Sequence, residues 1–105
     1  MKVAIDFDSV LVQRSGIPTS SEVWRDGPVK DSEDALWHFF RKGIDMYIFS
    51  VRGKEEKDKI REWLEKHDFP PIELITNEKQ PGTALYIDDR ALRFTNWQDV
   101  RKLLG

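Results

Sequence analysis

The feature that most constrains the fold of this chain is an apolar run near its N-terminus that ends in two carboxylates. Residues 3–11 read VAIDFDSVL, which places Asp6 and Asp8 one residue apart. A short apolar run of this kind predicts a buried strand, on which alternate side chains share a face, so we expect Asp6 and Asp8 to project to the same side. Two acids in that position repel each other, and a divalent cation with oxygen ligands relieves the repulsion most simply.

A second apolar run, residues 84–87, also ends in adjacent acids, Asp88 and Asp89. If both runs are parallel strands of one sheet, their carboxyl ends meet at the edge where open α/β sheets bind their ligands. Carboxylates from the two strands could then hold one Mg²⁺, which keeps several waters and accepts phosphate oxygens. The sequence therefore predicts a magnesium site between these two pairs of acids.

The rest of the chain alternates helical and extended patterns. Apolar spacing predicts helices over 31–42 and 54–67 and strands over 44–49 and 72–76. A last helix, capped by Thr95 or Asn96, is expected to turn its apolar side chains inward, namely Trp97, Val100, Leu103 and Leu104. This order predicts a single α/β domain, residues 1–105, with a Rossmann-like, mainly parallel sheet flanked by helices on both faces.

The segment from Gln13 to Lys30 is rich in Ser, Thr, Gly and Pro and predicts a long loop. Because it leaves the end of the first strand, we expect it to drape over the site, with Trp24 and Arg25 as its largest side chains. For Trp24, packing the loop down is favoured over contacting a substrate, because buried aromatic side chains mostly serve packing.

Composition excludes several classes of site. The chain has no cysteine, so disulfides and thiolate chemistry are excluded and only oxygen and imidazole metal ligands remain. Seventeen basic and nineteen acidic residues give a net charge of −2, which does not favour a nucleic-acid or membrane partner. No apolar run is long enough for a secretory signal or a membrane span, so a cytoplasmic protein is expected.

Groups that suit a phosphate also follow the predicted strands. Ser50 and Arg52 come directly after the strand over 44–49, and Gly53 would open the next helix with free N–H groups. Lys79 precedes the last strand, although Lys54 and Lys57 remain alternatives for the same role. Together with the acids, this set suits phosphoryl transfer, in which an attacking aspartate becomes an acyl phosphate.

These motifs resemble those of the haloacid dehalogenase-like (HAD) phosphohydrolases, and the resemblance spans nearly the whole chain. The matching motifs are Asp6-Phe7-Asp8-Ser9-Val10, Ser50, Lys79 and Asp88-Asp89. Ser9-Val10 stands where the family usually has Gly-Thr, and glycine there eases a turn. The segment over 12–30 is too short for a cap domain, so the chain looks like the small, capless bacterial and phage members.

The resemblance implies a role for each matched residue. Asp6 would be the nucleophile, and Asp8 would be the general acid and base. Mg²⁺ would be held by Asp6, the backbone carbonyl of Asp8, and Asp88, with Asp89 in support. Ser50 and Lys79 would hold the phosphate, and Arg52 joins them by its placement alone. In a capless site the substrate could be a phosphorylated small molecule or a nucleic-acid 3′-phosphate.

Two function classes follow, and others are less favoured. The first is a magnesium-dependent phosphatase. The second is a catalytically weak Mg²⁺/phosphate-binding module that acts through a partner protein, although the presence of Asp8 favours the enzyme. A sugar-nucleotide transferase would need a larger domain, and acids that merely solvate strand ends would not explain the order of the motifs. Oligomeric state stays open, since one of the four tryptophans could lie at a subunit contact.

Overall fold

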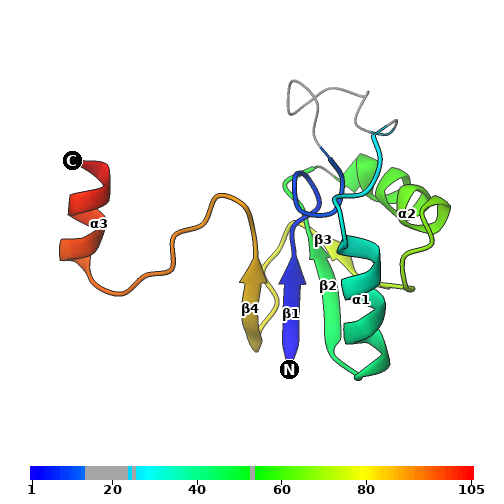
Figure 1. Cartoon of the computed structure of the whole chain (residues 1–105), viewed down its shortest axis with the longest axis horizontal. Helices are drawn as coiled ribbons and strands as arrows, with labels where there is room; N and C mark the ends of the chain where they lie inside the picture. The colour runs from blue at the N-terminus through cyan, green and yellow to red at the C-terminus, as the bar shows by residue number, and fades with distance from the viewer. Residues whose placement is uncertain (14–23, 25, 53) are drawn as a thin grey trace.

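The computed structural model describes residues 1–13, 24, 26–52 and 54–105. Its centre is a four-stranded sheet with the strand order β3-β2-β1-β4, in which every neighbouring pair is parallel (Figure 1). The elements, in chain order, are β1 (Lys2–Ile5), α1 (Ser32–Arg41), β2 (Asp45–Phe49), a short 3₁₀ turn η2 (Lys54–Glu56), α2 (Lys57–Lys66), β3 (Ile75–Thr76), β4 (Thr83–Ile87) and α3 (Trp97–Leu104). The predicted parallel α/β architecture is confirmed.

The register of the central strand determines where the site lies. Ile5 in β1 is opposite Ile48 in β2 on one side and Ile87 in β4 on the other. The ladder continues one residue further, because the Asp6 N–H donates to the Ile87 carbonyl at 3.0 Å. The residues that follow β1, β2 and β4 therefore meet at one edge of the sheet, as the sequence predicts.

One face of the sheet carries the hydrophobic core. Alternate side chains of β1 and β2 pack there against α1 and α2, in a cluster that contains Val3, Ile5, Met46, Ile48, Leu36, Ile60, Trp63 and Leu64. Phe7 closes the top of this core, with its ring edge-to-face on Trp63 at a centroid distance of 5.2 Å. Both α1 and α2 thus cover the same face.

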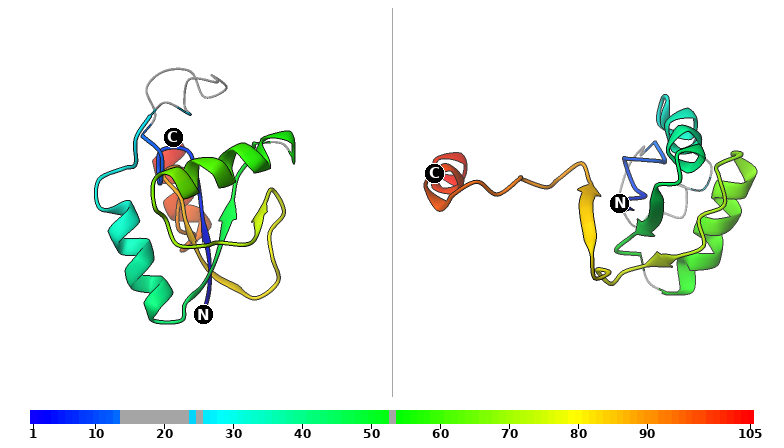
Figure 2. Two further views of the ribbon diagram at one scale, coloured as in Figure 1. Left: turned by 90° about the vertical axis from the view of Figure 1, so that its right-hand side faces the viewer. Right: turned by 90° about the horizontal axis from the view of Figure 1, so that it is seen from below.

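The opposite face carries Ala4, Tyr47, Phe49 and Tyr86, and none of the described helices covers it (Figure 2). Tyr86 in the edge strand β4 remains 38% exposed. The expectation of helices on both faces is therefore wrong for the described residues. The physical reason is the position of α3, the only helix that follows β4.

Helix α3 lies apart from the sheet, at the end of an extended arm over residues 88–96 (Figures 1 and 2). Its start matches the sequence, because the Asn96 side chain accepts a hydrogen bond from the Asp99 N–H at 2.9 Å. The expectation that its apolar side chains point inward is wrong: Trp97 is 72%, Leu103 65% and Leu104 79% exposed. The helix forms where predicted but does not pack where predicted.

Element ends differ modestly from the sequence prediction. Helix α1 ends before Gly43, whose φ of 76° suits glycine, but Asp31 has a φ of 69° and makes no side-chain cap. The strand expected over 72–76 is reduced to β3. The predicted loop falls mostly on residues 14–23 and 25, which lie outside the described residues, as does Gly53. Among the described residues, no helix has the length and apolar character that crossing a membrane requires.

Candidate active site

Three carboxylates converge at the edge of the sheet where β1 and β4 end. One carboxylate oxygen from each of Asp6, Asp88 and Asp89 lies within 4.8 Å of the others. Asp6 is half-buried, while Asp88 and Asp89 are exposed. The two acid pairs that are far apart in the sequence thus meet because β1 and β4 are neighbours.

Local hydrogen bonds orient this cluster. The Phe7 N–H donates to Asp6 Oδ1 at 2.8 Å, and the Arg90 N–H donates to Asp88 Oδ1 at the same distance. Arg90 also approaches Asp89, but its Nε is 3.8 Å from the carboxylate oxygen and its side chain is 69% exposed. The backbone therefore fixes two of the carboxylates, and the exposed guanidinium offsets little of their charge.

Burial raises the pKa of Asp6 from its usual 3.8 to about 6, against the lowering effect of the Phe7 N–H. Repulsion from Asp88, Asp89 and Asp8 raises the pKa further. Both causes disfavour the charged carboxylate, so the cluster gains stability from a proton or a cation.

The donor set fits a hard divalent cation. Three carboxylates offer only oxygen ligands, and two of them are exposed so that waters can complete the coordination. Burial first, and then repulsion from the neighbouring acids, raises the pKa of Asp6. Mg²⁺ and Ca²⁺ both prefer such ligands, and Mg²⁺ commonly uses few carboxylates and several waters.

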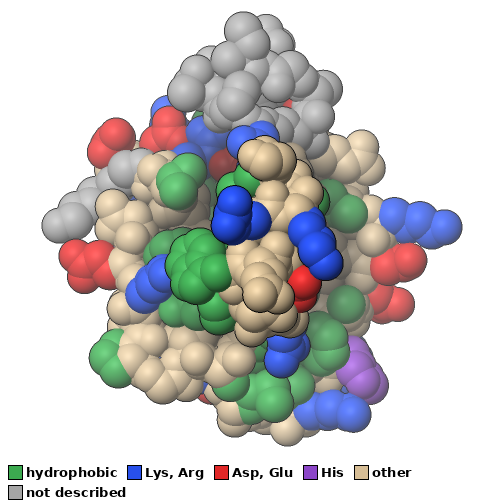
Figure 3. Space-filling view, turned by 90° about the vertical axis from the view of Figure 1, so that its left-hand side faces the viewer, with side chains coloured by type: hydrophobic (Ala, Val, Ile, Leu, Met, Phe, Trp, Pro, Cys, Tyr) green, Lys and Arg blue, Asp and Glu red, His purple; other side chains and the backbone are tan. Residues whose placement is uncertain are grey.

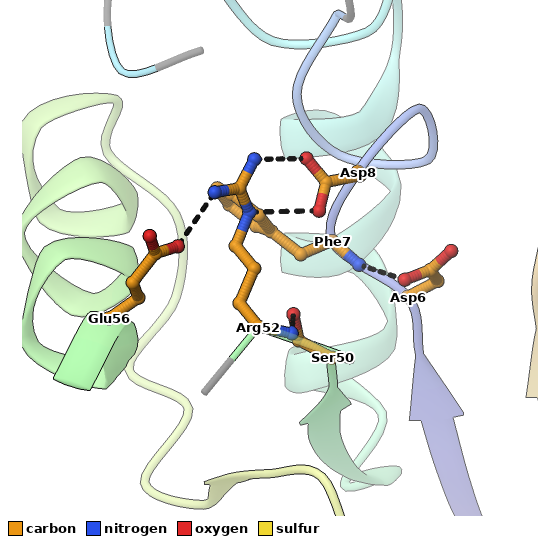
Figure 4. A network of polar contacts seen from close by, with 6 residues as sticks. All are labelled: Asp6, Phe7, Asp8, Ser50, Arg52 and Glu56. Carbon is orange, nitrogen blue, oxygen red and sulfur yellow. Dashed lines mark hydrogen bonds and ion pairs between the residues drawn. The ribbon is translucent and has the colours of Figure 1, made fainter. Parts of the chain in front are cut away.

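Asp8 takes a different direction from Asp6 (Figure 4). Its two carboxylate oxygens accept hydrogen bonds from Arg52 Nε at 2.9 Å and Arg52 Nη2 at 2.8 Å. The remaining terminal nitrogen of Arg52 bonds Glu56 at 2.7 Å, and the Trp24 ring lies 5.1 Å from the guanidinium carbon. The structure does not place the Asp8 carboxylate in the acid cluster, although both were expected on one side of the strand.

The turn after β1 explains this difference. The strand ends at Ile5, so strand alternation no longer governs Asp8, and Ser9 adopts a φ of 66° in the left-handed region. The turn is closed by hydrogen bonds from Leu11 and Val12 N–H groups to the Phe7 carbonyl. Ser9 thus occupies a conformation that glycine adopts without strain, at the position where the resembled family usually has glycine.

Ser50 and Arg52 line a second part of the same edge, after β2. Ser50 is 2% exposed and its Oγ accepts a hydrogen bond from the Arg52 N–H at 3.2 Å. A cavity of about 350 Å³ opens beside them, and its lining includes Lys57, Thr76 and Asn77. A hydroxyl and two cationic side chains therefore face one hollow, together with the acidic Glu78, and the three donors could bind an anion there.

Lys79 lies elsewhere. Its Nζ is 5.6 Å from the centre of the Tyr86 ring, on the sheet face that lacks a helix. No ion pair joins it to an acid of the cluster among the described residues. Of the alternative lysines, Lys57 lines the cavity beside Ser50, while the side chain of Lys54 lies outside what the structure describes.

Glu56 is the residue that the sequence prediction missed. It holds Arg52 through an ion pair of 2.7 Å and is itself 28% exposed. Its spacing of four residues from Arg52 was the available signal, because such pairs meet on one side of a helical turn.

Searches against protein-family models, curated proteins and solved structures find no match to this chain.

Proposed function

We propose that this protein is a Mg²⁺-dependent phosphohydrolase that cleaves a phosphomonoester through a phosphorylated aspartate. The observation that carries the proposal is the meeting of Asp6, Asp88 and Asp89 within 4.8 Å at the carboxyl edge of a parallel sheet. The buried Ser50 hydroxyl and the Arg52 guanidinium lie at the same edge. A cation site beside anion-binding donors is what transfer of a phosphoryl group requires.

Asp6 is the nucleophile in this mechanism. Because the Phe7 N–H occupies Asp6 Oδ1, the other oxygen is available to attack phosphorus. A bond from Asp6 to phosphorus forms as the bond from phosphorus to the leaving alkoxide breaks. Water then attacks the phosphorus of the acyl phosphate, which releases inorganic phosphate and restores the carboxylate. Mg²⁺ held by Asp6, Asp88 and Asp89 would supply positive charge opposite the phosphoryl oxygens.

Asp8 performs the two proton transfers, to the leaving alkoxide and from the attacking water. In the structure both of its oxygens accept hydrogen bonds from Arg52. The acid and base role therefore requires Arg52 to release Asp8. A substrate phosphate is a suitable competitor, because guanidinium groups bind phosphate as well as carboxylate in a bidentate manner.

The same ion pair favours a second candidate, the Mg²⁺/phosphate-binding module with weak turnover. If Arg52 stays on Asp8, the site keeps its cation ligands but lacks a free general acid. Such a protein would bind Mg²⁺ and phosphate and act through a partner. Turnover separates the two candidates.

The test is hydrolysis of an aryl phosphate and an alkyl phosphate, with Mg²⁺ and with EDTA. We expect Mg²⁺-dependent release of phosphate, and a loss of at least about 1,000-fold in Asp6→Asn. Asp8→Asn should lose more on the alkyl ester, whose leaving group needs a proton more. Asp45→Asn, which removes an exposed acid at the opposite end of β2, is the matched control and should keep full activity.

Two outcomes would contradict this assignment. Mg²⁺-dependent turnover that survives in Asp6→Asn would exclude the covalent route. Calorimetric binding of Mg²⁺ without turnover of any ester would leave the binding module. A panel of phosphorylated metabolites, run beside an end-labelled oligonucleotide with a 3′-phosphate, would then separate the two substrate classes.

A further inference from the structure

Helix α3 needs a packing partner that the described residues of its own chain do not provide. It has eight residues, and isolated helices of fewer than about 12 residues are marginal in water. Its apolar side chains Trp97, Val100 and Leu104 follow one another at helical spacing, and Leu103 lies beside them. Helices α1 and α2 bury comparable residues, whereas α3 buries none.

The arm adds to this exposed apolar surface. Leu92 is 55% and Phe94 58% exposed, and the Phe94 ring packs on Trp97 at a centroid distance of 5.4 Å. Figure 3 views this side of the molecule and shows hydrophobic side chains exposed between Lys and Arg side chains. Exposed apolar surface of this extent is typical of an interaction site.

The sheet of the same chain offers a matching surface. On the face without a helix, the Phe49 and Tyr86 rings contact each other at 5.9 Å over the buried Ala4 and Tyr47. Tyr86, in the edge strand β4, is 38% exposed on this face. A parallel sheet is normally covered by helices on both faces, but none of the described helices covers this face, where Lys79 and Gln80 contact Tyr86 and Tyr47.

Charge favours the pairing of these two surfaces. The last turn of α3 carries Arg101 and Lys102. The carboxyl end of β4 carries Asp88 and Asp89, both exposed. A helix that lies along the open face can therefore meet opposite charge at the acid cluster, which favours this placement and steers association.

We propose that two copies of this chain exchange α3, so that the helix of each copy covers the open sheet face of the other. The extended arm holds α3 away from its own sheet, where a second copy can reach it. Because the exchange is reciprocal, it satisfies both exposed surfaces in both copies and closes the assembly as a two-fold dimer. This inference does not depend on the proposed enzymatic function.

The first test is the mass of the full chain in solution, measured by light scattering over a wide range of concentration. We expect a dimer, whose dissociation constant rises about 30-fold or more in Trp97→Asp. Gln98→Ala, on the polar side of the same helix, is the matched control and should leave the dimer unchanged. A wild-type monomer at all concentrations, or a Trp97→Asp dimer of unchanged affinity, would overturn the exchange.

Cross-linking between introduced cysteines tests where α3 docks. Because the chain has no native cysteine, only the introduced thiols can react. We expect a mixture of Tyr86→Cys chains and Val100→Cys chains to form a covalent dimer with a short bismaleimide. Glu65→Cys on α2, mixed with Val100→Cys, is the control and should not cross-link. In the double variant Tyr86→Cys/Val100→Cys, cross-linking within one chain would show that α3 folds onto its own sheet, against the proposal.

Discussion

Apolar side chains with similar sequence patterns are buried at one end of the sheet and exposed at the other. Around β1 and β2, apolar side chains such as Ile5 and Ile48 are almost fully buried under α1 and α2. Around β4 and α3, side chains of the same kind are much more exposed: Leu85 is 47% and Leu104 79% exposed. An apolar pattern therefore identifies a face that needs burial, but it does not say what buries it.

The largest difference between the two ends should appear in stability. Ile48→Ala removes a fully buried side chain from the core and should lower the free energy of unfolding by about 3–4 kcal/mol. Leu104→Ala should cost less than about 0.5 kcal/mol when measured in dilute protein, where any dimer has dissociated. Chemical denaturation measures both, and equal losses would contradict the comparison.

The ion pairs near β1 and β2 should also contribute more to stability than the ion pair after β4. The Arg52 side chain is 7% exposed and bonds Asp8 and Glu56, so Arg52→Ala leaves two partly buried carboxylates unpaired and should cost about 2–3 kcal/mol. The exposed contact between Arg90 and Asp89 spans 3.8 Å, and Arg90→Ala should cost less than about 0.5 kcal/mol. Thermal unfolding of the two variants provides the measurement. A larger loss in Arg90→Ala would reverse our interpretation.

The acid cluster contains residues from both parts of the sheet, Asp6 after β1 and Asp88 and Asp89 after β4. The pH dependence of protein stability tests whether these acids repel one another. The pKa of Asp6 is raised to about 6 in the folded protein, so the folded state binds the proton more tightly than the unfolded state. Without metal, stability should therefore fall as the pH rises from about 4 to about 6, by about 1 kcal/mol after allowance for solvent screening. Metal affinity should weaken below the pKa of Asp6, because the cation competes with the proton.

Asp6→Asn should remove this slope, and Asp88→Asn should reduce it by removing part of the repulsion. The measurement is thermal unfolding in EDTA at several pH values. If the stability of the wild type relative to Asp6→Asn rises over the same pH range, the pKa of Asp6 is lowered instead, and the two acid pairs do not repel each other as described.

The smallest effect concerns two left-handed residues, one at each end. Ser9 has a φ of 66° and Gly82 a φ of 79°. Ser9→Gly should stabilise the protein by about 0.5–1 kcal/mol, because glycine relieves the strain but loses more entropy on folding. Gly82→Ser should cost a similar amount, since no atom crowds the added Cβ and only the backbone resists. Denaturation midpoints compare the two, and stabilisation in both would contradict this account.

Much of the fold follows from local patterns, and the errors lie where packing decides. The apolar runs and the acids that follow them located β1 and β4 in the sequence. Because these two strands are parallel neighbours, Asp6 and Asp88 lie close together. The position of Asp8 was not predictable by alternation, because the strand ends at Ile5 and the next residues form a turn. Asn96 marked the start of α3, but no local signal shows whether a helix packs on its own sheet or on another.

Lys79 illustrates a further limit of the sequence. Its position upstream of β4 favoured a phosphate-binding role, yet its ammonium lies over the Tyr86 ring. Lys57, which the sequence left as an alternative, lines the cavity beside Ser50. Which lysine reaches an anion depends on the path of the connecting chain, and spacing in the sequence does not determine that path.

The pairing of β1 with β4 has a consequence for the order of folding. Lys2 is opposite Thr83 and Ile5 is opposite Ile87, so these contacts join the first strand of the chain to the last. Bringing such distant segments together costs chain entropy before any contact repays it, and contacts of this kind slow folding. We therefore expect the β1–β2 half to assemble early and the acid cluster to form last, so that cation binding during refolding would follow the slowest kinetic phase.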